Sequence, residues 1–255
     1  MANEENTPKT ISRSERTHAK NGENIHIVKT TATELGTVYN PNNPLILLTA
    51  VTEFETNFET LTQAVNAAVF NEQDKVGKQI AAFKLVSGRV GKIIKAAKAQ
   101  GLSAEFLENL RSTANRLNGI RVDKSTPDTS PDAPPLNDKG TSSVSRRSYA
   151  GILESLGLLD EQLKGNSMYD PNEPEYKAEA ISAWIESLRV IHDEALDAKI
   201  ATRTARNTRS STIYNQTTGL LVRMNAIKAY LETILDKNDP RLKQIKKLRF
   251  VDLSK

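Results

Sequence analysis

The sequence predicts an all-α protein built from two similar halves. Each half is expected to form a hairpin of long helices, and the two hairpins to pack as a pseudo-symmetric four-helix bundle with short flanking helices. The first observation is an internal repeat, because YNPNNP at 39–44 returns as YDPNEP at 169–174. The second is a heptad pattern of apolar residues after each copy of this motif. An internal repeat decides the architecture before any other feature.

The apolar pattern repeats with the same offset of 130 residues. Steps of three and four residues place these side chains on one face of a helix that packs against another, as in a coiled coil. The first six positions are Val51, Phe54, Phe58, Leu61, Val65 and Ala68, which return as Ile181, Trp184, Leu188, Ile191, Ala195 and Ala198. Four later positions are Phe83, Val90, Ile94 and Ala97, which return as Ile213, Leu220, Met224 and Ile227.

The composition narrows the class of protein. The chain has 255 residues, of which 38% are hydrophobic and 5% aromatic, as expected of long amphipathic helices with one exposed face. It has no cysteine, which removes disulfides, thiolate nucleophiles and cysteine metal sites. The N-terminus has no apolar segment of the kind that predicts a secretory signal. The apolar run at 44–48 is too short to span a bilayer. We therefore expect a soluble, cytoplasmic protein.

The first half is read in order along the chain. Residues 1–20 are polar without periodicity and are expected to be a disordered tail. The first repeat, 21–122, opens with a short helix or irregular segment at about 24–36. In the turn at 39–44, each proline pushes the preceding residue out of the helical region, and asparagine side chains cap the next helix. A long helical stretch follows to about 100, and a short helix ends at about 117.

The second half follows a linker at 123–147, which is rich in proline, serine and aspartate and is expected to be flexible. The second repeat, 148–255, copies the first. It begins with a short helix to about 163, and after its turn a long helical stretch runs from 175 to about 235. Asp239 and Pro240 are the start signals of a last short helix.

One ambiguity remains inside each repeat. The long stretch could be a single helix of about 55 to 60 residues, at roughly 1.5 Å of rise per residue. Alternatively it folds back near Gly77 and, in the second copy, near Asn207, both of which tolerate left-handed geometry. We favour the fold-back because it buries the apolar seam within one compact unit.

The charges separate by helix. Residues 75–98 carry seven bases and no acid, and 203–228 carry only bases, whereas the preceding helical segments are mostly acidic. One interpretation is a basic face for nucleic acid. The other, which we favour at a net charge of only +4, is that acidic helices pack beside basic ones. The candidate interaction face consists of Lys84, Arg89, Lys92, Lys95, Arg203, Arg206 and Arg209.

The sequence contains no pattern that predicts catalysis. Its three histidines, His18, His26 and His192, lack a second histidine at the spacing of metal ligands on a helix. Glycine-rich phosphate loops and the serine nucleophile motif are missing as well. We therefore expect no catalytic, cofactor-binding or metal-binding residues, and no enzyme. Trp184, the sole tryptophan, occupies the seam position of Phe54 and is expected in the core.

Several segments resemble a group of Bacteroidota proteins that have no assigned activity. The segments that carry the resemblance are 218–221 (TGLL), 228–230 (KAY), 242–250 (LKQIKKLRF), 115–119 (NRLNG) and the turn at 39–44. The resemblance covers most of residues 24–250. It implies a repeated, all-helical bacterial protein and no catalytic residues.

These features together favour a non-enzymatic helical scaffold or partner-binding protein, with a protein partner or self-association. The alternative is a nucleic-acid-associated protein that uses the basic helices at 75–98 and 203–228. A third hypothesis is a membrane-active helical protein, but the sequence lacks the apolar hairpin that such proteins insert into the membrane.

Overall fold

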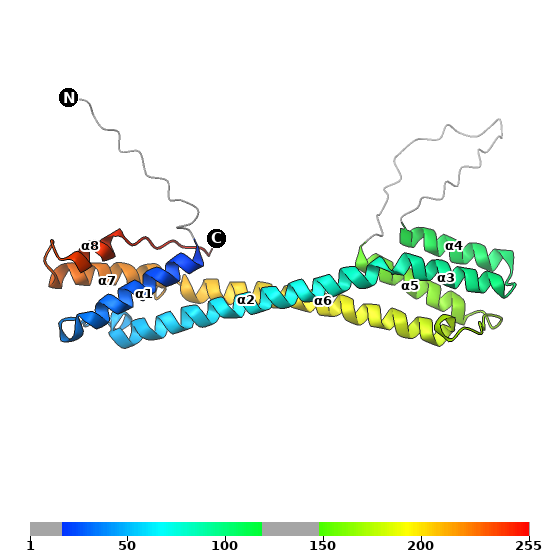
Figure 1. Cartoon of the computed structure of the whole chain (residues 1–255), viewed down its shortest axis with the longest axis horizontal. Coiled ribbons are helices and arrows are strands. Elements are labelled where there is room, and N and C mark those ends of the chain that lie inside the picture. The colour runs from blue at the N-terminus through cyan, green and yellow to red at the C-terminus, as the bar shows by residue number, and fades with distance from the viewer. Residues whose placement is uncertain (1–16, 119–147, 255) are drawn as a thin grey trace, which may run out of the picture. The chain divides into compact units, whose positions relative to one another are not determined.

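The computed structural model describes residues 17–118 and 148–254, and every regular element within these ranges is a helix (Figure 1). The all-α prediction is therefore confirmed for this part of the chain. The predicted linker at 123–147 and most of the predicted tail lie outside it. The α-helices are α1 (His18–Glu34), α2 (Leu48–Lys84), α3 (Val86–Ala99), α4 (Ala104–Asn118), α5 (Tyr149–Lys164), α6 (Ala178–Ile213), α7 (Leu220–Ile234) and α8 (Pro240–Lys247). The 3-10 helices are η2 (Gly36–Val38), η3 (Pro44–Ile46) and η4 (Pro174–Tyr176).

The predicted fold-back near Gly77 and Asn207 is wrong. The helix α2 runs unbroken through Gly77 for 37 residues, and α6 runs through Asn207 for 36 residues. A single glycine inside a helix costs only about 1 kcal/mol relative to alanine, which packing of a long apolar seam outweighs. Among the described residues, positive φ occurs only at Gly36 and Gly101.

The single long helix is not formed either, because each stretch is interrupted later than expected. Leu85 separates α2 from α3, and its amide donates to the Ala82 carbonyl three residues back at 3.3 Å. In the second half, residues 214–219 separate α6 from α7. Gly219 is required there, because a Cβ at this position would lie 2.4 Å from the Asn215 carbonyl oxygen.

The described residues divide by their internal contacts into two compact units. The first unit comprises 17–72 and 198–254, and the second unit comprises 73–118 and 148–197. Each unit contains residues from both predicted repeats, because α2 and α6 each contribute one part of their length to each unit.

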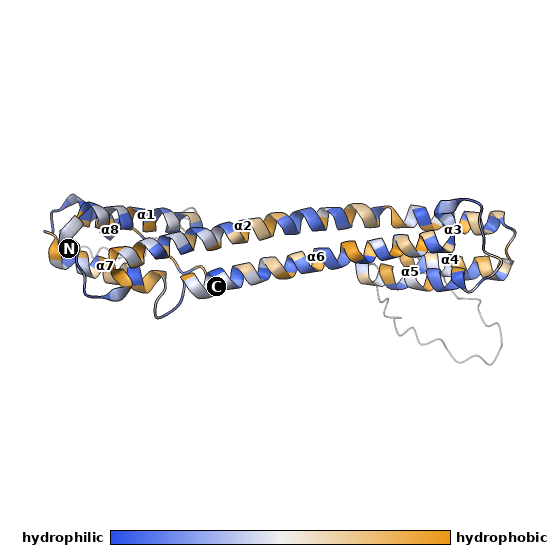
Figure 2. Cartoon of the chain, turned by 90° about the horizontal axis from the view of Figure 1, so that it is seen from below, coloured by the Kyte–Doolittle hydropathy of each residue, from blue (hydrophilic) through white to orange (hydrophobic). Residues whose placement is uncertain are grey.

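Burial along the long helices follows the predicted seam. Figure 2 shows apolar positions recurring between polar ones along α2 and α6. The buried seam residues are Val51, Phe54, Phe58 and Val65 on α2, and Ile181, Leu188, Ala195 and Ala198 on α6. These eight positions are therefore buried, as the apolar seam predicts, whereas Leu61, Ala68, Trp184 and Ile191 are only partly buried.

Each unit has its own apolar core. The first unit buries residues of α1, α7 and α8 with the near parts of the long helices, among them Ile25, Val51, Ile213, Leu220, Ile227 and Ile245. The second unit buries residues of α3, α4 and α5 in the same way, among them Ile93, Leu110, Leu156, Leu159, Leu163 and Ile181. Trp184 packs against this second core but is only partly buried, whereas Phe54 is 7% exposed.

The two proline-containing turns are held by the same hydrogen bond. The Tyr39 hydroxyl donates to the Ile46 carbonyl at 2.6 Å, and the Tyr169 hydroxyl donates to the Tyr176 carbonyl at 2.7 Å. These two pairs are separated by the offset of 130 residues. Each bond closes the turn over its own 3-10 helix and thereby sets the direction in which the long helix leaves.

Each turn is also attached to a helix of the other predicted repeat. The Asn40 amide donates to the Tyr230 hydroxyl of α7 at 3.0 Å, and the Asp170 amide donates to Oε1 of Gln100, next to the end of α3, at 3.2 Å. The residues of both pairs again differ by 130. The turn of one repeat thus packs on the other repeat within each unit.

The segment after α8 is extended and lies on α1. Nδ2 of Asn21 donates to the Val251 carbonyl at 2.8 Å, and the Val251 amide donates back to Oδ1 of Asn21 at 3.2 Å. Nδ2 of Asn24 donates to the Arg249 carbonyl at 2.8 Å. Both asparagines are buried, so the first unit uses them to bind the main chain of its own C-terminal segment.

Candidate interaction surface

The seven bases of the predicted interaction face lie in both units. Lys84, Arg89, Lys92 and Lys95 belong to the second unit, and Arg203, Arg206 and Arg209 to the first. Lys84, Lys92, Lys95, Arg203 and Arg206 are exposed, whereas Arg89 and Arg209 are partly buried. The two partly buried arginines pack against other residues of their own units and are therefore less available to a partner than the five exposed bases.

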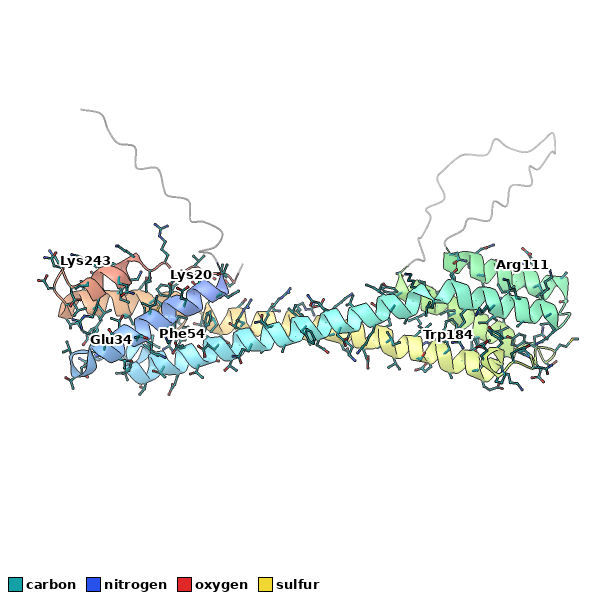
Figure 3. The ribbon with its side chains drawn as sticks, viewed as in Figure 1. Lys20, Glu34, Phe54, Arg111, Trp184 and Lys243 are labelled. Atoms are coloured by element: carbon teal, nitrogen blue, oxygen red, sulfur yellow. The ribbon has the colours of Figure 1, made fainter. Side chains whose placement is uncertain are left out.

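Arg89 is held within the second unit. Its guanidinium lies 4.5 Å from the ring centre of Trp184, and Nη2 is 3.4 Å from the Glu175 carbonyl oxygen. In the first unit, Arg223 lies 4.9 Å from the ring centre of Phe54 and donates to the Leu45 carbonyl at 2.6 Å. Phe54 and Trp184 both lie near the start of their long helices (Figure 3). Arg89 therefore covers an aromatic seam residue.

Arg209 is similarly constrained in the first unit. Its Nε atom is buried and has no hydrogen-bond partner in the described part of the chain. Burial lowers the pKa of the Arg209 guanidinium, and the neighbouring Arg206 lowers it further, against the opposing effect of Tyr214. Of the three predicted bases on α6, only Arg203 and Arg206 are exposed.

One ion pair supports the packing of an acidic helix beside a basic one. Nζ of Lys75 on α2 lies 2.8 Å from Oε2 of Glu194 on α6, within the second unit. Nearby, Nε2 of the buried Gln79 and Nδ1 of His192 are 2.6 Å apart. This ion pair and this hydrogen bond join the basic part of α2 to the acidic part of α6 within the second unit.

The second unit has a cleft of about 530 Å³ between α3 and the turn that precedes α6. We call it the α3 cleft. Its lining consists of Lys92, Lys95, Ala96, Ala99, Gln100, Asp170, Asn172, Glu173 and Tyr176. A smaller hollow of about 340 Å³ shares Lys92 and Tyr176 with it and reaches Leu85, Gly88, Arg89 and Glu175. Volumes of this size accommodate a drug-sized molecule or a few side chains of a partner.

Opposite charges line the α3 cleft. Lys92 and Lys95 come from α3, whereas Asp170 and Glu173 come from the turn. All four side chains are exposed, and no ion pair within 4.0 Å joins the lysines to these carboxylates among the described residues. Asp170 instead lies 3.6 Å from Lys177. Both kinds of charge are thus available to a partner.

The local sequence explains why the α3 cleft is open. Ala96 and Ala99 present only methyl groups on α3, which leaves room beside the turn. The turn itself is fixed by Pro174, which starts η4, and by the hydrogen bond from the Asp170 amide to Gln100. The Nε2 atom of Gln100 is buried without a partner in the described residues. The turn and α3 thus form the two walls of the cleft, and the four charged side chains extend from them.

The charges of the α3 cleft are not needed to build the turn. The corresponding positions in the first unit, offset by 130, carry no charge and form the same hydrogen bonds. Lys92 and Lys95 correspond to Val222 and Asn225, Asp170 and Glu173 correspond to Asn40 and Asn43, and Tyr176 corresponds to Ile46. The second unit thus carries four charges at positions where the first unit has uncharged residues and forms the same hydrogen bonds.

Sequence reasoning found Lys92 and Lys95 but missed the acidic side of the α3 cleft. The available signal was the difference between the two copies of the motif, YNPNNP and YDPNEP. Both acids of the cleft, Asp170 and Glu173, are substitutions for asparagine in this comparison.

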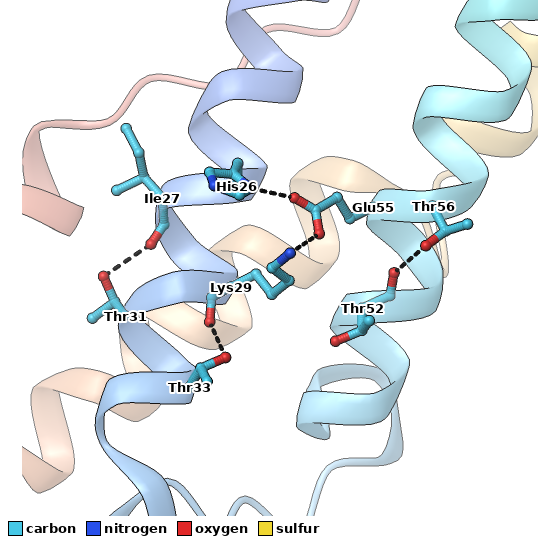
Figure 4. A network of polar contacts seen from close by, with 8 residues as sticks. All are labelled: His26, Ile27, Lys29, Thr31, Thr33, Thr52, Glu55 and Thr56. Carbon is cyan, nitrogen blue, oxygen red and sulfur yellow. Dashed lines mark hydrogen bonds and ion pairs between the residues drawn. The ribbon is translucent and has the colours of Figure 1, made fainter.

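The first unit contains a buried carboxylate, shown in Figure 4. Oε1 of Glu55 lies 2.7 Å from Nδ1 of His26, and Oε2 lies 2.6 Å from Nζ of Lys29. Burial alone would raise the pKa of Glu55, but the hydrogen bonds from Lys29 and His26 outweigh it, so the pKa lies below its usual value. This network connects α1 to α2 and has the geometry of a structural ion pair.

Within residues 17–118 and 148–254, no three histidine, aspartate or glutamate side chains are grouped as metal ligands would be. None of the helices in these ranges is both long and apolar enough to cross a membrane.

The chain matches no family model, no curated protein and no solved structure in the comparisons. The resemblance to Bacteroidota proteins therefore stays a prediction. The function has to be argued from the geometry of the two units alone.

Proposed function

We propose that the protein is a non-enzymatic helical scaffold that binds a protein partner through the α3 cleft. The observation that carries this proposal is that Lys92 and Lys95 line the same open cleft as Asp170 and Glu173. A surface with both signs of charge beside the methyl groups of Ala96 and Ala99 fits the mixed surface of a protein. The absence of these charges from the corresponding positions of the first unit supports a role beyond folding.

Nucleic acid is the second candidate partner. The exposure of Arg203 and Arg206 on α6 favours it, because exposed bases on one helix can contact phosphates. The carboxylates in the α3 cleft argue against nucleic acid at that site, since they would repel a phosphate backbone.

We also infer that the chain arose by internal duplication and that its two units are built on the same internal arrangement. The matching hydrogen bonds of Tyr39 and Tyr169, and of Asn40 and Asp170, support this origin. The heptad spacing on α2 and α6 supports coiled-coil packing of the long helices.

Photo-crosslinking tests the protein-binding role. Ala99 is exposed in the α3 cleft and can be replaced by p-benzoylphenylalanine in cells that produce the protein. We expect a crosslinked product of defined mass that disappears when Lys92→Glu and Lys95→Glu are added. The control places the photo-reactive group at Ala183, an exposed position of α6 outside the cleft, and should give no such product. Equal labelling at both positions, or none at either, would reject the proposal.

Salt-dependent binding to a DNA column tests the second candidate. If nucleic acid is the partner, retention at low salt should fall when Arg203 and Arg206 are changed to alanine and should be lost at moderate salt. Retention that is absent at low salt removes this candidate.

A further inference from the structure

The charges of the α3 cleft form two rows. Lys92 and Lys95 lie one helical turn apart on α3, and Asp170 and Glu173 lie on the opposite wall. No ion pair joins the two rows among the described residues. Asp170 lies 3.6 Å from Lys177, but both side chains are exposed, so solvent screens this contact and the acidic row can still contact a partner. A complementary partner must therefore present acids and bases side by side.

A two-fold axis makes such a surface complementary to itself. In a two-fold contact, residue i of one copy meets residue j of the other, and j meets i. The basic row of each copy would then face the acidic row of its partner. A second copy of the chain always carries the required pattern, which no other partner is certain to do.

The same face also offers apolar surface. Leu85, in the short break between α2 and α3, lines the hollow that continues the α3 cleft and is 70% exposed. The ring of Tyr176 lines both hollows. Burial of such apolar groups would contribute most of the free energy of association, because exposed ion pairs at the rim of an interface contribute little.

We propose that the α3 cleft is a two-fold contact between two copies of this chain, in which Lys92 and Lys95 of each copy meet Asp170 and Glu173 of the other. This inference rests on the proposed protein-binding function and names its partner. The turn at 170–173 of one copy lies against α3 of the other, and the reverse contact forms at the same time. The four charges that distinguish the second unit then have a common purpose.

Charge reversal tests the contact with the full chain. Sedimentation velocity over a range of protein concentrations should show a monomer–dimer equilibrium for the wild type. The acidic variant, Lys92→Glu with Lys95→Glu, and the basic variant, Asp170→Lys with Glu173→Lys, should each weaken dimerisation at least about tenfold. Each variant carries the same sign of charge at all four positions of the two rows, so these rows of its two copies repel one another.

Mixing the two variants in equal amounts should restore a dimer, because every row then meets its opposite. The control is Lys237→Glu with Lys247→Glu, which changes the net charge equally on exposed residues of the first unit and should leave dimerisation unchanged. Equal melting temperatures by circular dichroism show that the variants fold.

A wild type that stays monomeric at all concentrations overturns the two-fold contact, as does a mixture that forms no dimer. The photo-crosslinking at Ala99 distinguishes this failure from failure of the proposed function. A crosslink to a different protein leaves the binding role intact and rejects only self-association, whereas no crosslink of any kind rejects both.

Discussion

The guanidinium of Arg89 stacks on the indole ring of Trp184, with 4.5 Å between them, and completes the cover of a seam residue that the core encloses only in part. Arg223 does the same for Phe54 at 4.9 Å. Their carbonyl acceptors, at Glu175 and Leu45, are 130 residues apart, although the arginines themselves are 134 apart. An arginine thus covers the aromatic ring in both units, but the two arginines do not occupy corresponding positions of the repeat.

Removal of either aromatic ring should destabilise its unit. Replacing a buried aromatic residue with alanine typically costs about 3 to 5 kcal/mol. We expect Phe54→Ala to approach this range and Trp184→Ala to cost less, because Trp184 keeps part of its ring exposed. Urea unfolding followed by circular dichroism measures both. A loss for Trp184→Ala as small as for an exposed residue, such as Phe70→Ala on α2, would contradict its place in the seam.

Trp184 is the only tryptophan, so its fluorescence reports on the second unit alone. Arg89→Ala should shift its emission maximum to longer wavelength, because water replaces the guanidinium over the ring, and should cost about 0.5 to 1 kcal/mol. The matched control is Arg223→Ala, which removes the equivalent arginine from the first unit and should leave the emission unchanged. The opposite pattern would show that Arg89 does not cover the ring in solution.

Arg223→Ala should nevertheless destabilise the protein more than Arg89→Ala does. Nη1 of Arg223 donates to the Leu45 carbonyl at 2.6 Å, and Nε donates to the Thr218 carbonyl at 2.7 Å. Hydrogen bonds from charged groups contribute about 1.5 to 3 kcal/mol, so their loss exceeds that of a cation–π contact. Chemical denaturation compares the two variants, with the exposed Arg203→Ala expected to remain within about 0.5 kcal/mol of wild type.

Glu55 should make the stability of the first unit depend on pH. Its pKa is lowered in the folded state, so its contribution is present above the unfolded-state pKa and is lost as the pH falls through the folded-state value. We expect Glu55→Gln to cost on the order of 1 kcal/mol near neutral pH, because solvent screens the mostly exposed His26. Acidification should then destabilise this variant less than the wild type.

Urea midpoints measured between pH 3 and pH 7 check this expectation. The control is Glu59→Gln, an exposed glutamate one helical turn along α2, which should keep the pH dependence of the wild type. Parallel curves for wild type and Glu55→Gln would mean that the contacts to Lys29 and His26 contribute no stability.

Asn21→Ala should release the C-terminal segment from α1. The side chain is fully buried and exchanges two hydrogen bonds with Val251, so its removal leaves main-chain groups without partners. Such a loss costs about 1 to 3 kcal/mol. Hydrogen exchange at the Val251 amide should accelerate, whereas Asn42→Ala, at an exposed asparagine, should leave it unchanged. Unchanged protection in Asn21→Ala would show that other contacts hold the segment.

The candidate site could be predicted only in part. The sequence identified Lys92 and Lys95 as one side of a basic face, but their acidic neighbours on the turn lie about 75 residues away along the chain. The tertiary structure brings the two together through the bond from the Asp170 amide to Gln100. It also showed that Arg89 covers Trp184. A basic residue counted from the sequence is therefore not always available to bind a partner.

The sequence by itself determined the helices, their apolar faces and the two turns, because these depend on spacing and on local capping. Val51, Phe58 and Val65 are buried as the heptad pattern predicts. Only the tertiary structure decided where the helices end and what they pack against. A heptad pattern states which face of a helix is apolar but not which helix covers it. The helix α2 continues through Gly77 because the packing of its apolar face outweighs the cost of one glycine. Each turn forms a hydrogen bond with a residue of the other repeat, which local sequence alone could not indicate.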